Sequence, residues 1–219
     1  KYANSGDVNG KKDSVVGYSS IIIHQGQSKK IGPLNKNQKK RLIEIAREAI
    51  RGHVERGVRI NVKEDDQRLQ EKEGAFVSVY KDGLLRGCIG NILGSGPVYL
   101  TVRDMAISSA SKDYRFKPIQ KDELDGIQIE ISVLSKPRRI KNIDEIHLGI
   151  HGVIVTKGSK SGVFLPQVAD STGWTKERFL SELCSQKADL PSDCWKDPQK
   201  IKIEVFTADV FSEKDINHN

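Results

Sequence analysis

The stretch Asp82-Gly83-Leu84-Leu85-Arg86-Gly87-Cys88-Ile89-Gly90 decides the fold, because it holds a turn signal and the start of a strand. Residues 75–81, just before it, have the valine-rich and aromatic composition of a strand. Asp-Gly is a pair that a two-residue type I′ turn favours, since both central residues need positive φ. The sequence therefore predicts a β-hairpin. Because strand side chains alternate between faces, we expect Arg86 and Cys88 on one face, opposite Val79 and Val77.

The second strand of this hairpin combines a thiol, a cation and two glycines. A nearby guanidinium favours thiolate over thiol, so Cys88 beside Arg86 is a candidate nucleophile. Each feature also has a structural explanation. A free cysteine is often a small core residue, and Arg86 can bind carbonyls or pair with Glu130. Gly87 and Gly90 can serve only close backbone packing or a bulge.

The composition indicates a folded globular protein. The chain has 219 residues and a hydrophobic content of 37%, which is enough for a substantial core. Its three cysteines are an odd number without framework spacing, which favours a reduced, cytoplasmic setting over a disulfide scaffold. No apolar run approaches the roughly 20 residues of a membrane-spanning helix, so membrane insertion is not expected.

The net charge of +7 invites a nucleic-acid hypothesis, but the charge is unevenly distributed. Residues 1–40 contain eight lysines and two aspartates, whereas the rest of the chain has 28 basic and 27 acidic residues. The basic excess therefore belongs to the N-terminal segment. A nearly neutral body disfavours a nucleic-acid-binding role, which stays the weakest of the functional alternatives.

The N-terminal part is expected to be a mobile leader over residues 1–34, with a brief strand at 20–24. A helix is predicted over residues 36–56 from its apolar spacing. Asn35 and Gln38 form a capping-box pattern at its start, and Gly57 is suited to end it.

Two further elements complete the part of the chain around the hairpin. Pro97 is predicted to be the first residue of a helix that covers the hairpin. Residues 127–133 alternate strictly between isoleucine or valine and polar residues, which predicts a strand over residues 127–134. Glu130 lies on its polar face and is expected either to face a functional site or to pair with a neighbouring cation.

The C-terminal part has the pattern of a small glycine-rich unit. Strands are predicted at residues 150–156 and 162–168, followed by a helix over 176–188 with apolar residues and Cys184 facing inward. Another strand, at residues 201–205, is expected to return to the first sheet.

These elements predict an α+β fold with two subdomains. The larger subdomain comprises residues 35–145 and 196–213, with an antiparallel sheet flanked by helices. The smaller one comprises residues 146–195.

The chain lacks the common cofactor and metal motifs. The glycines at positions 87, 90, 94 and 96 match neither a dinucleotide-binding nor a P-loop spacing. No Gly-x-Ser-x-Gly elbow is present, and no His, Cys and carboxylate set has metal-ligand spacing. We therefore predict no cofactor and no metal.

Several motifs in order carry a family resemblance. They are Leu85-Arg86-Gly87-Cys88-Ile89-Gly90, Arg115-Phe116, Glu130-Ile131-Ser132-Val133-Leu134, His151-Gly152 and Leu165-Pro166-Gln167-Val168. Together they resemble the AMMECR-type domain family over about residues 35–212. The resemblance implies an α+β fold whose smaller subdomain is three-stranded, with the cysteine motif near a cleft between the subdomains. It also implies an association with Memo-like and radical-SAM proteins.

The resulting functional hypothesis is a cysteine-dependent enzyme, or an enzyme partner, that acts at this cleft. Cys88 would be the nucleophile and His151 the general base. Arg86 and Arg115 would stabilise a thiolate or an anionic substrate, and Gly87, Gly90, Glu130 and Gln167 would complete the cleft. The alternative is a non-catalytic module that binds a small molecule or a protein partner.

Overall fold

The computed structural model of the chain describes residues 2–4, 17–19, 32–197 and 200–217. It divides into two compact units, Lys1–Gly32 and Pro33–Asn219. In the first unit, β1 (Tyr2–Asn4) pairs with β2 (Gly17–Ser19) in antiparallel orientation. The strand predicted at residues 20–24 lies outside the described residues.

The second unit begins with the helix α2 (Lys36–Arg56), whose two predicted ends are confirmed. The Asn35 side chain accepts a hydrogen bond from the backbone N–H of Gln38, and the Gln38 side chain accepts one from the N–H of Asn35. This capping box satisfies two donors that the first helical turn leaves free. Gly57 adopts φ 68° and ends the helix, as glycine does readily in this left-handed region.

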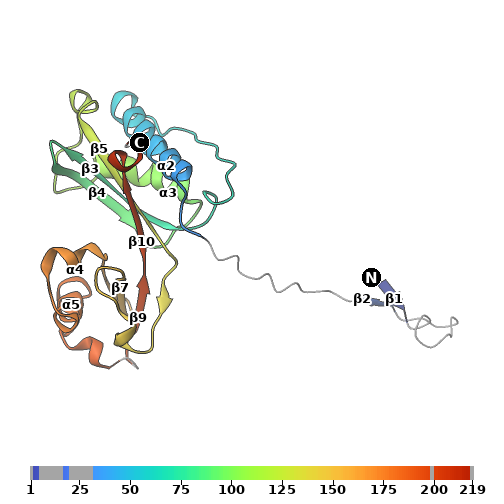
Figure 1. Cartoon of the computed structure of the whole chain (residues 1–219), viewed down its shortest axis with the longest axis vertical. Helices are drawn as coiled ribbons and strands as arrows, with labels where there is room; N and C mark the ends of the chain where they lie inside the picture. Colours follow the sequence, from blue (N-terminus) through green and yellow to red (C-terminus); the bar gives the residue numbers. More distant parts are fainter. Residues whose placement is uncertain (1, 5–16, 20–31, 198–199, 218–219) are drawn as a thin grey trace. The chain divides into compact units, whose positions relative to one another are not determined.

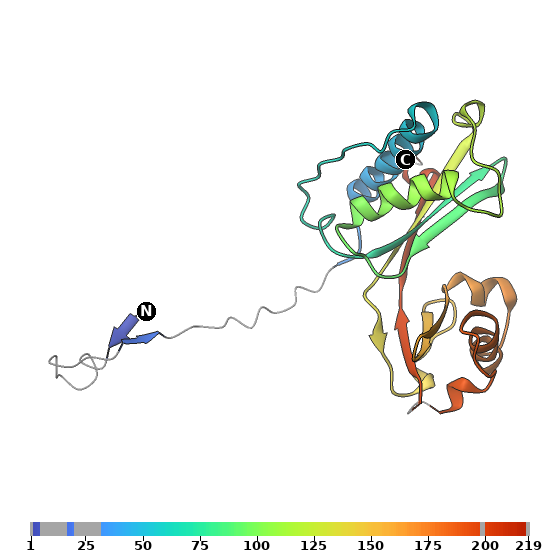
Figure 2. The ribbon, with the colours of Figure 1, turned by 180° about the vertical axis from the view of Figure 1, so that it is seen from behind.

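The first sheet has four antiparallel strands in the order β10-β5-β3-β4. The strands are β3 (Gly74–Lys81), β4 (Leu84–Asn91), β5 (Ile127–Leu134) and β10 (Ala208–Ser212). α2 and α3 (Val98–Ser111) lie together on one face of this sheet (Figures 1 and 2). Pro97 is the N-cap of α3 rather than its first residue, one position from the prediction. The apolar side chains of β3 and β5 pack against the two helices in one buried core.

The hairpin is confirmed, but its predicted register is wrong. Asp82 and Gly83 have φ of 52° and 77°, as a type I′ turn requires. The pairing then shifts between Val79 and Tyr80, so that Cys88 lies opposite Ser78 and not opposite Val77. Leu85 pairs with Tyr80 and Gly87 with Val79, which leaves Arg86 as the extra residue of a β-bulge.

The second sheet also has four antiparallel strands, in the order β6-β9-β7-β8. They are β6 (Arg138–Arg139), β7 (Gly152–Lys157), β8 (Lys160–Phe164) and β9 (Lys202–Phe206). α4 (Gln167–Thr172) and α5 (Lys176–Glu182) follow β8, and apolar residues of α5 pack with β7 and β9 in a separate core. Figure 1 shows both helices beside the strands of this sheet.

The last strands differ from the prediction in two ways. The strand predicted at residues 201–205 pairs with β7 in the second sheet, and the chain returns to the first sheet only with β10. β6 adds a fourth strand where three were expected. At the passage between the sheets, the N–H of Ser135 donates to the Thr207 carbonyl at 2.9 Å, and the N–H of Thr207 donates to Ser135 Oγ at 2.9 Å. These reciprocal bonds hold the two connecting segments together.

A small buried cluster joins the two sheets. It comprises Leu134 of β5, Ile154 of β7 and Phe206 of β9. The remaining short helical turns are η1 (Lys121–Glu123), η2 (Ile143–Glu145), the π-helical η3 (Leu183–Lys187), η4 (Cys194–Lys196) and α6 (Glu213–Asn217).

The expectation of reduced cysteines is wrong for two of the three. Cys184 and Cys194 form a disulfide with 6.1 Å between their Cα atoms, and Cys88 is free. The two residues are only 10 apart in sequence, and η3 and η4 bring them together. In the part of the chain that the structure describes, no helix is long and apolar enough to cross a membrane.

Candidate functional site

Cys88 lies in a row of polar side chains that crosses the whole first sheet. The register aligns Cys88 of β4 with Ser78 of β3, Glu130 of β5 and Ser212 of β10. Val77 and Val79, which flank Ser78, are buried in the core that contains α2 and α3. Because strand side chains alternate, the row projects from the opposite face of the sheet. Cys88 is half-buried there.

Hydrogen-bonding groups lie between the thiol and the carboxylate on this face. The Ser78 hydroxyl lies 3.3 Å from Cys88 Sγ, and the Tyr80 phenol donates to Glu130 Oε1 at 3.4 Å. The pKa of Tyr80 is raised, first by burial and then by the Glu130 charge, while the nearby Ser78 hydroxyl opposes the shift. Ser78 is therefore hydrogen-bonded to Cys88 and lies near Tyr80, but no hydrogen bond found among the described residues joins the two hydroxyl groups. The four groups lie together on this face as two hydrogen-bonded pairs, Ser78 with Cys88 and Tyr80 with Glu130.

Asp113 and Arg115 hold the backbone of Cys88 from the outer side of the edge strand β4. The N–H of Cys88 donates to Asp113 Oδ2 at 2.9 Å, and Arg115 Nη2 donates to the Cys88 carbonyl at 3.3 Å. The two side chains also bind each other through two hydrogen bonds, of 2.9 and 2.7 Å. Arg115 and the Cys88 N–H hold the pKa of the buried Asp113 carboxyl far below its usual range. This clamp satisfies the edge of the sheet and fixes the position of Cys88.

Arg86 does not contact Cys88 by a hydrogen bond in the structure. Its guanidinium forms two bonds of 2.9 Å with Glu123 and one of 3.2 Å to the Lys117 carbonyl. The Arg86 hydrogen bond lowers the pKa of Glu123. The sequence predicted Arg86 as the cation beside Cys88. In the structure Arg115 has this position, because it binds the Cys88 carbonyl.

The two glycines of the motif permit close packing, which is the structural explanation that the sequence offers for them. A Cβ at Gly87 would collide with the Ser109 carbonyl of α3, and one at Gly90 would collide with the Phe76 ring. Ser109 Oγ also accepts the N–H of Ile89 at 2.8 Å and donates to the Val77 carbonyl at 2.7 Å. The absence of a Cβ at Gly87 therefore lets α3 lie directly against the hairpin, and its absence at Gly90 leaves room for the Phe76 ring.

A cavity of about 220 Å³ opens beside the carboxylate end of the row. Tyr80, Gln128, Glu130 and Ser212 are among the residues that line it. Glu130 does not pair with a cation in any ion pair found among the described residues, and its hydrogen-bond partner is Tyr80. The carboxylate thus lies at a place that a small molecule can reach.

His151 and Gln167 lie outside this hydrogen-bonded group. His151 Nδ1 accepts the backbone N–H of His147 at 3.1 Å, and the two rings are 5.3 Å apart. Burial, then the charges of His147 and Arg138, lowers the pKa of His151. No hydrogen bond of the described residues joins His151 to Cys88. Gln167 is an exposed residue at the start of α4. The general-base role of His151 stays a prediction.

The sequence interpretation missed Ser78, Tyr80 and Asp113 as site residues. Ser78 and Tyr80 occupy alternate positions of the predicted strand, so the sequence pattern indicates a polar face of the hairpin. The β-bulge, which the sequence did not predict, changes which residue lies opposite the thiol. Asp113 is two residues before Arg115, and only the fold brings it to the edge of β4. Among the described residues, no three His, Cys, Asp or Glu side chains are grouped to hold a metal ion.

The chain has clear relatives. The AMMECR1 family matches residues 43–211. A protein of Methanopyrus kandleri is 41% identical over 183 residues, covering 80% of this chain and 87% of the relative. A protein of Methanothermobacter thermautotrophicus is 37% identical over 191 residues, covering 84% of this chain and 98% of the relative.

A solved structure has the same fold. The crystal structure of an uncharacterised protein from Pyrococcus horikoshii is 38% identical, with a TM-score of 0.71, and covers 79% of this chain and 90% of that one. The names of these relatives state no activity. The sequence motifs, the fold and these matches agree with the predicted resemblance, and the chain belongs to the AMMECR1 family.

Proposed function

We propose that this protein is a cysteine-dependent enzyme whose active site is the polar face of the first sheet. The observation that supports the proposal most is the grouping of Cys88, Ser78, Tyr80 and Glu130 on one face, where Ser78 bonds to Cys88 and Tyr80 bonds to Glu130. A path of hydroxyl groups that ends on an acceptor-only carboxylate can carry a proton away from a thiol.

The proton moves in three linked transfers. The Ser78 hydroxyl, which donates to Cys88 Sγ in the structure, first turns toward Tyr80. Cys88 then gives its proton to Ser78, Ser78 gives its own to Tyr80, and Tyr80 gives its own to Glu130. A thiol is a weaker acid than a glutamic acid by about four pKa units, so the transfer is favourable only as the new sulfur bond forms. In this proposal Glu130, and not His151, is therefore the general base, and it acts through the two hydroxyl groups.

The reaction class that fits is acyl transfer. The sulfur of Cys88 forms a bond to the acyl carbon, and the bond from that carbon to the leaving group breaks. The leaving group takes the proton that the path returns. Water or a second acceptor then attacks the thioester, releases the acyl group and restores the thiol.

Asp113 and Arg115 are positioning residues in this proposal. They bind the N–H and carbonyl of Cys88 and so fix the direction of the thiol on an edge strand. The cavity beside Glu130 is suited to hold part of the substrate.

The test is a burst assay with p-nitrophenyl acetate, which releases a coloured leaving group on acylation. We expect one equivalent of p-nitrophenolate per chain, no burst in Cys88→Ser, and a burst about tenfold slower in Glu130→Gln. The matched control is Glu48→Gln, because Glu48 is exposed on α2. It should react like the parent protein.

Two results would count against the proposal. If the parent protein reacts no faster than N-acetylcysteine, the thiol is not activated and the non-catalytic binding module becomes the better assignment. If Glu130→Gln reacts as fast as the parent, the path to the carboxylate has no role.

The proposal includes an association with Memo-like or radical-SAM proteins and a cytoplasmic location. The first is supported by family membership. The second no longer has the support of reduced cysteines, because Cys184 and Cys194 are bonded. Co-elution with a purified Memo-like protein in size-exclusion chromatography tests the association, and separate elution at micromolar concentration contradicts it.

A further inference from the structure

A second cavity, of about 250 Å³, lies at the β6 edge of the second sheet. Ile140 and Ile143 line one side of it, Trp195 lines another, and Ile203 of β9 also contributes. None of these residues belongs to the row that contains Cys88. The volume is below the roughly 300–1,000 Å³ that holds drug-sized ligands, so the cavity suits a smaller molecule.

The floor of this cavity is apolar and belongs to the second core. Ile140 and Ile203 are buried, and the N–H of Ile140 donates to the Ile203 carbonyl at 3.0 Å. Ile143 and Trp195 pack against the same core. An apolar group placed here would therefore cover side chains that are otherwise at the edge of the core.

The walls are held in place from several directions. The Trp195 indole N–H donates to Ser181 Oγ at 3.1 Å, and the disulfide joins the preceding residue, Cys194, to Cys184. On the other side, Lys176 Nζ donates to the Ile143 carbonyl at 3.2 Å. The cavity is thus formed before a ligand enters, which lowers the entropic cost of binding.

Two lysines, Lys141 and Lys196, are among the residues that line the same cavity, and neither is in an ion pair within the described ranges. The Lys196 ammonium lies 5.7 Å from the centre of the Trp195 ring.

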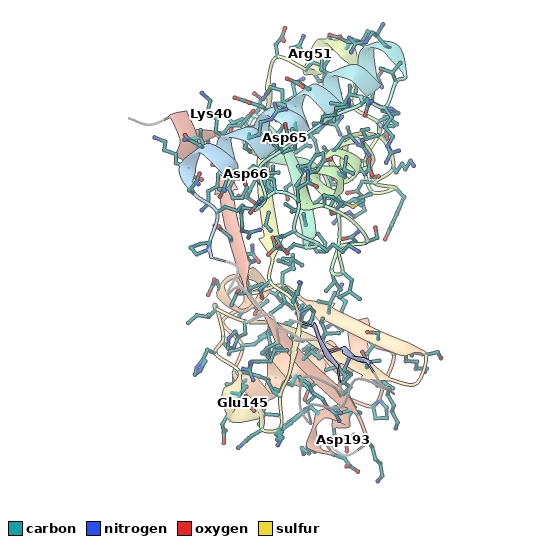
Figure 3. The ribbon with its side chains drawn as sticks, turned by 90° about the vertical axis from the view of Figure 1, so that its right-hand side faces the viewer. Lys40, Arg51, Asp65, Asp66, Glu145 and Asp193 are labelled. Carbon is teal, nitrogen blue, oxygen red and sulfur yellow. A yellow bond between two sulfur atoms is a disulfide. The ribbon has the colours of Figure 1, made fainter. Side chains whose placement is uncertain are left out.

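The carboxylates nearby are engaged elsewhere or exposed. Glu145 accepts from Arg138 at 2.6 Å and from the N–H of Lys141 at 3.0 Å, and Asp144 accepts from the Asn142 amide at 2.9 Å. Asp193 is exposed, three residues before Lys196. Figure 3 shows Glu145 and Asp193 at the same end of the molecule, on the two chain segments that line the cavity. The arrangement leaves two cations beside an apolar floor.

We propose that this cavity binds a small aromatic carboxylate. The ring lies against Trp195 and the isoleucine side chains, and the carboxylate binds the ammonium groups of Lys141 and Lys196. The inference is independent of the proposed acyl transfer, because it uses a different sheet and different residues.

The two tryptophans allow a direct test by NMR. Trp174 and Trp195 give two indole N–H signals, which a Trp195→Phe protein assigns. The full chain is titrated with 3-phenylpropionate, with its neutral analogue 3-phenylpropan-1-ol, and with acetate. We expect 3-phenylpropionate to shift the Trp195 signal to saturation, and the two analogues to bind at least tenfold more weakly.

Charge variants complete the experiment. The double variant Lys141→Met, Lys196→Met should bind 3-phenylpropionate at least tenfold more weakly. Lys157→Met should bind it like the parent, since Lys157 is an exposed lysine at the end of β7 and outside the cavity. The proposal is overturned if the neutral analogue binds as tightly, if the double variant binds as tightly, or if the Trp195 signal does not saturate.

Discussion

The Ser78 hydroxyl lies 3.3 Å from the Cys88 sulfur, across neighbouring strands of the first sheet. The outward N–H of Cys88 binds Asp113, so Cys88 and Ser78 are a pair that does not exchange backbone hydrogen bonds. Side chains of such pairs lie closer together than those of hydrogen-bonded pairs. The β-bulge at Arg86 produces this pairing, because it moves Cys88 from Val77 to Ser78.

Ser78→Ala should slow the alkylation of Cys88 by iodoacetamide about fivefold at neutral pH, because the path to Glu130 would be interrupted. Cys88 is the only cysteine of the three that is free, so mass spectrometry can follow a single adduct. Ser159→Ala, in an exposed turn, is the control. Equal rates for all three proteins would show that the hydroxyl has no part in thiol reactivity.

Asp113→Ala should lower the free energy of unfolding by about 1–3 kcal/mol, because the Cys88 N–H would lose its acceptor and Arg115 its partner. Urea unfolding at neutral pH measures this loss. Asp122→Ala, at an exposed position of η1, should change stability by less than about 0.5 kcal/mol.

The same pair predicts a pH dependence. The pKa of Asp113 is lower in the folded protein than the usual value of about 3.9 in an unfolded chain. Its stabilising contribution is therefore complete above about pH 5 and is lost as the pH falls further. The difference in the free energy of unfolding between the parent and Asp113→Ala should therefore become smaller over this acid range. A difference that stays constant would contradict the lowered pKa of Asp113.

Gly87→Ala should destabilise the protein by about 1–3 kcal/mol, because its Cβ would meet the Ser109 carbonyl of α3. Gly96→Ala is the matched control, since a Cβ there meets no atom within 4 Å. Thermal unfolding of the two variants measures the difference. Similar melting temperatures would mean that α3 can move away from the hairpin without cost.

His151 should make stability fall between about pH 7 and pH 5. Burial is the first cause of its lowered pKa, and Nδ1 must be unprotonated to accept from the His147 N–H. The unfolded chain therefore binds a proton more readily than the folded one, and stability is lost as the pH falls below about 6.5. His151→Gln should lose less stability over this range than the parent. The same pH dependence in His151→Gln would assign the effect to another group.

Reduction of the Cys184–Cys194 disulfide should lower the free energy of unfolding by about 2–3 kcal/mol, as expected for a loop of this short length. The measurement uses urea unfolding of a Cys88→Ser protein with and without dithiothreitol. Detection of two free thiols in that protein before reduction would contradict the bond.

Local patterns in the sequence determined several elements of this protein. The Asn35 and Gln38 capping box, the Asp82-Gly83 turn and the alternation over Ile127–Leu134 were predicted correctly. Each depends on residues that are neighbours in the chain, where propensity and periodicity act directly. The order of the motifs was enough to predict the family.

The tertiary structure decided the features that depend on distant residues. Arg86, the extra residue of the bulge, binds Glu123, which is 37 residues later in the chain. Asp113 binds the N–H of Cys88, which is 25 residues earlier. The assignment of β9 and β10 to different sheets follows from their pairing with β7 and β5, since an alternating apolar pattern does not identify its partner strand. The disulfide likewise formed where two helical turns meet. Sequence alone thus indicated that Cys88 was of interest, but the groups that surround it were determined by the pairing of strands and the packing of the helix.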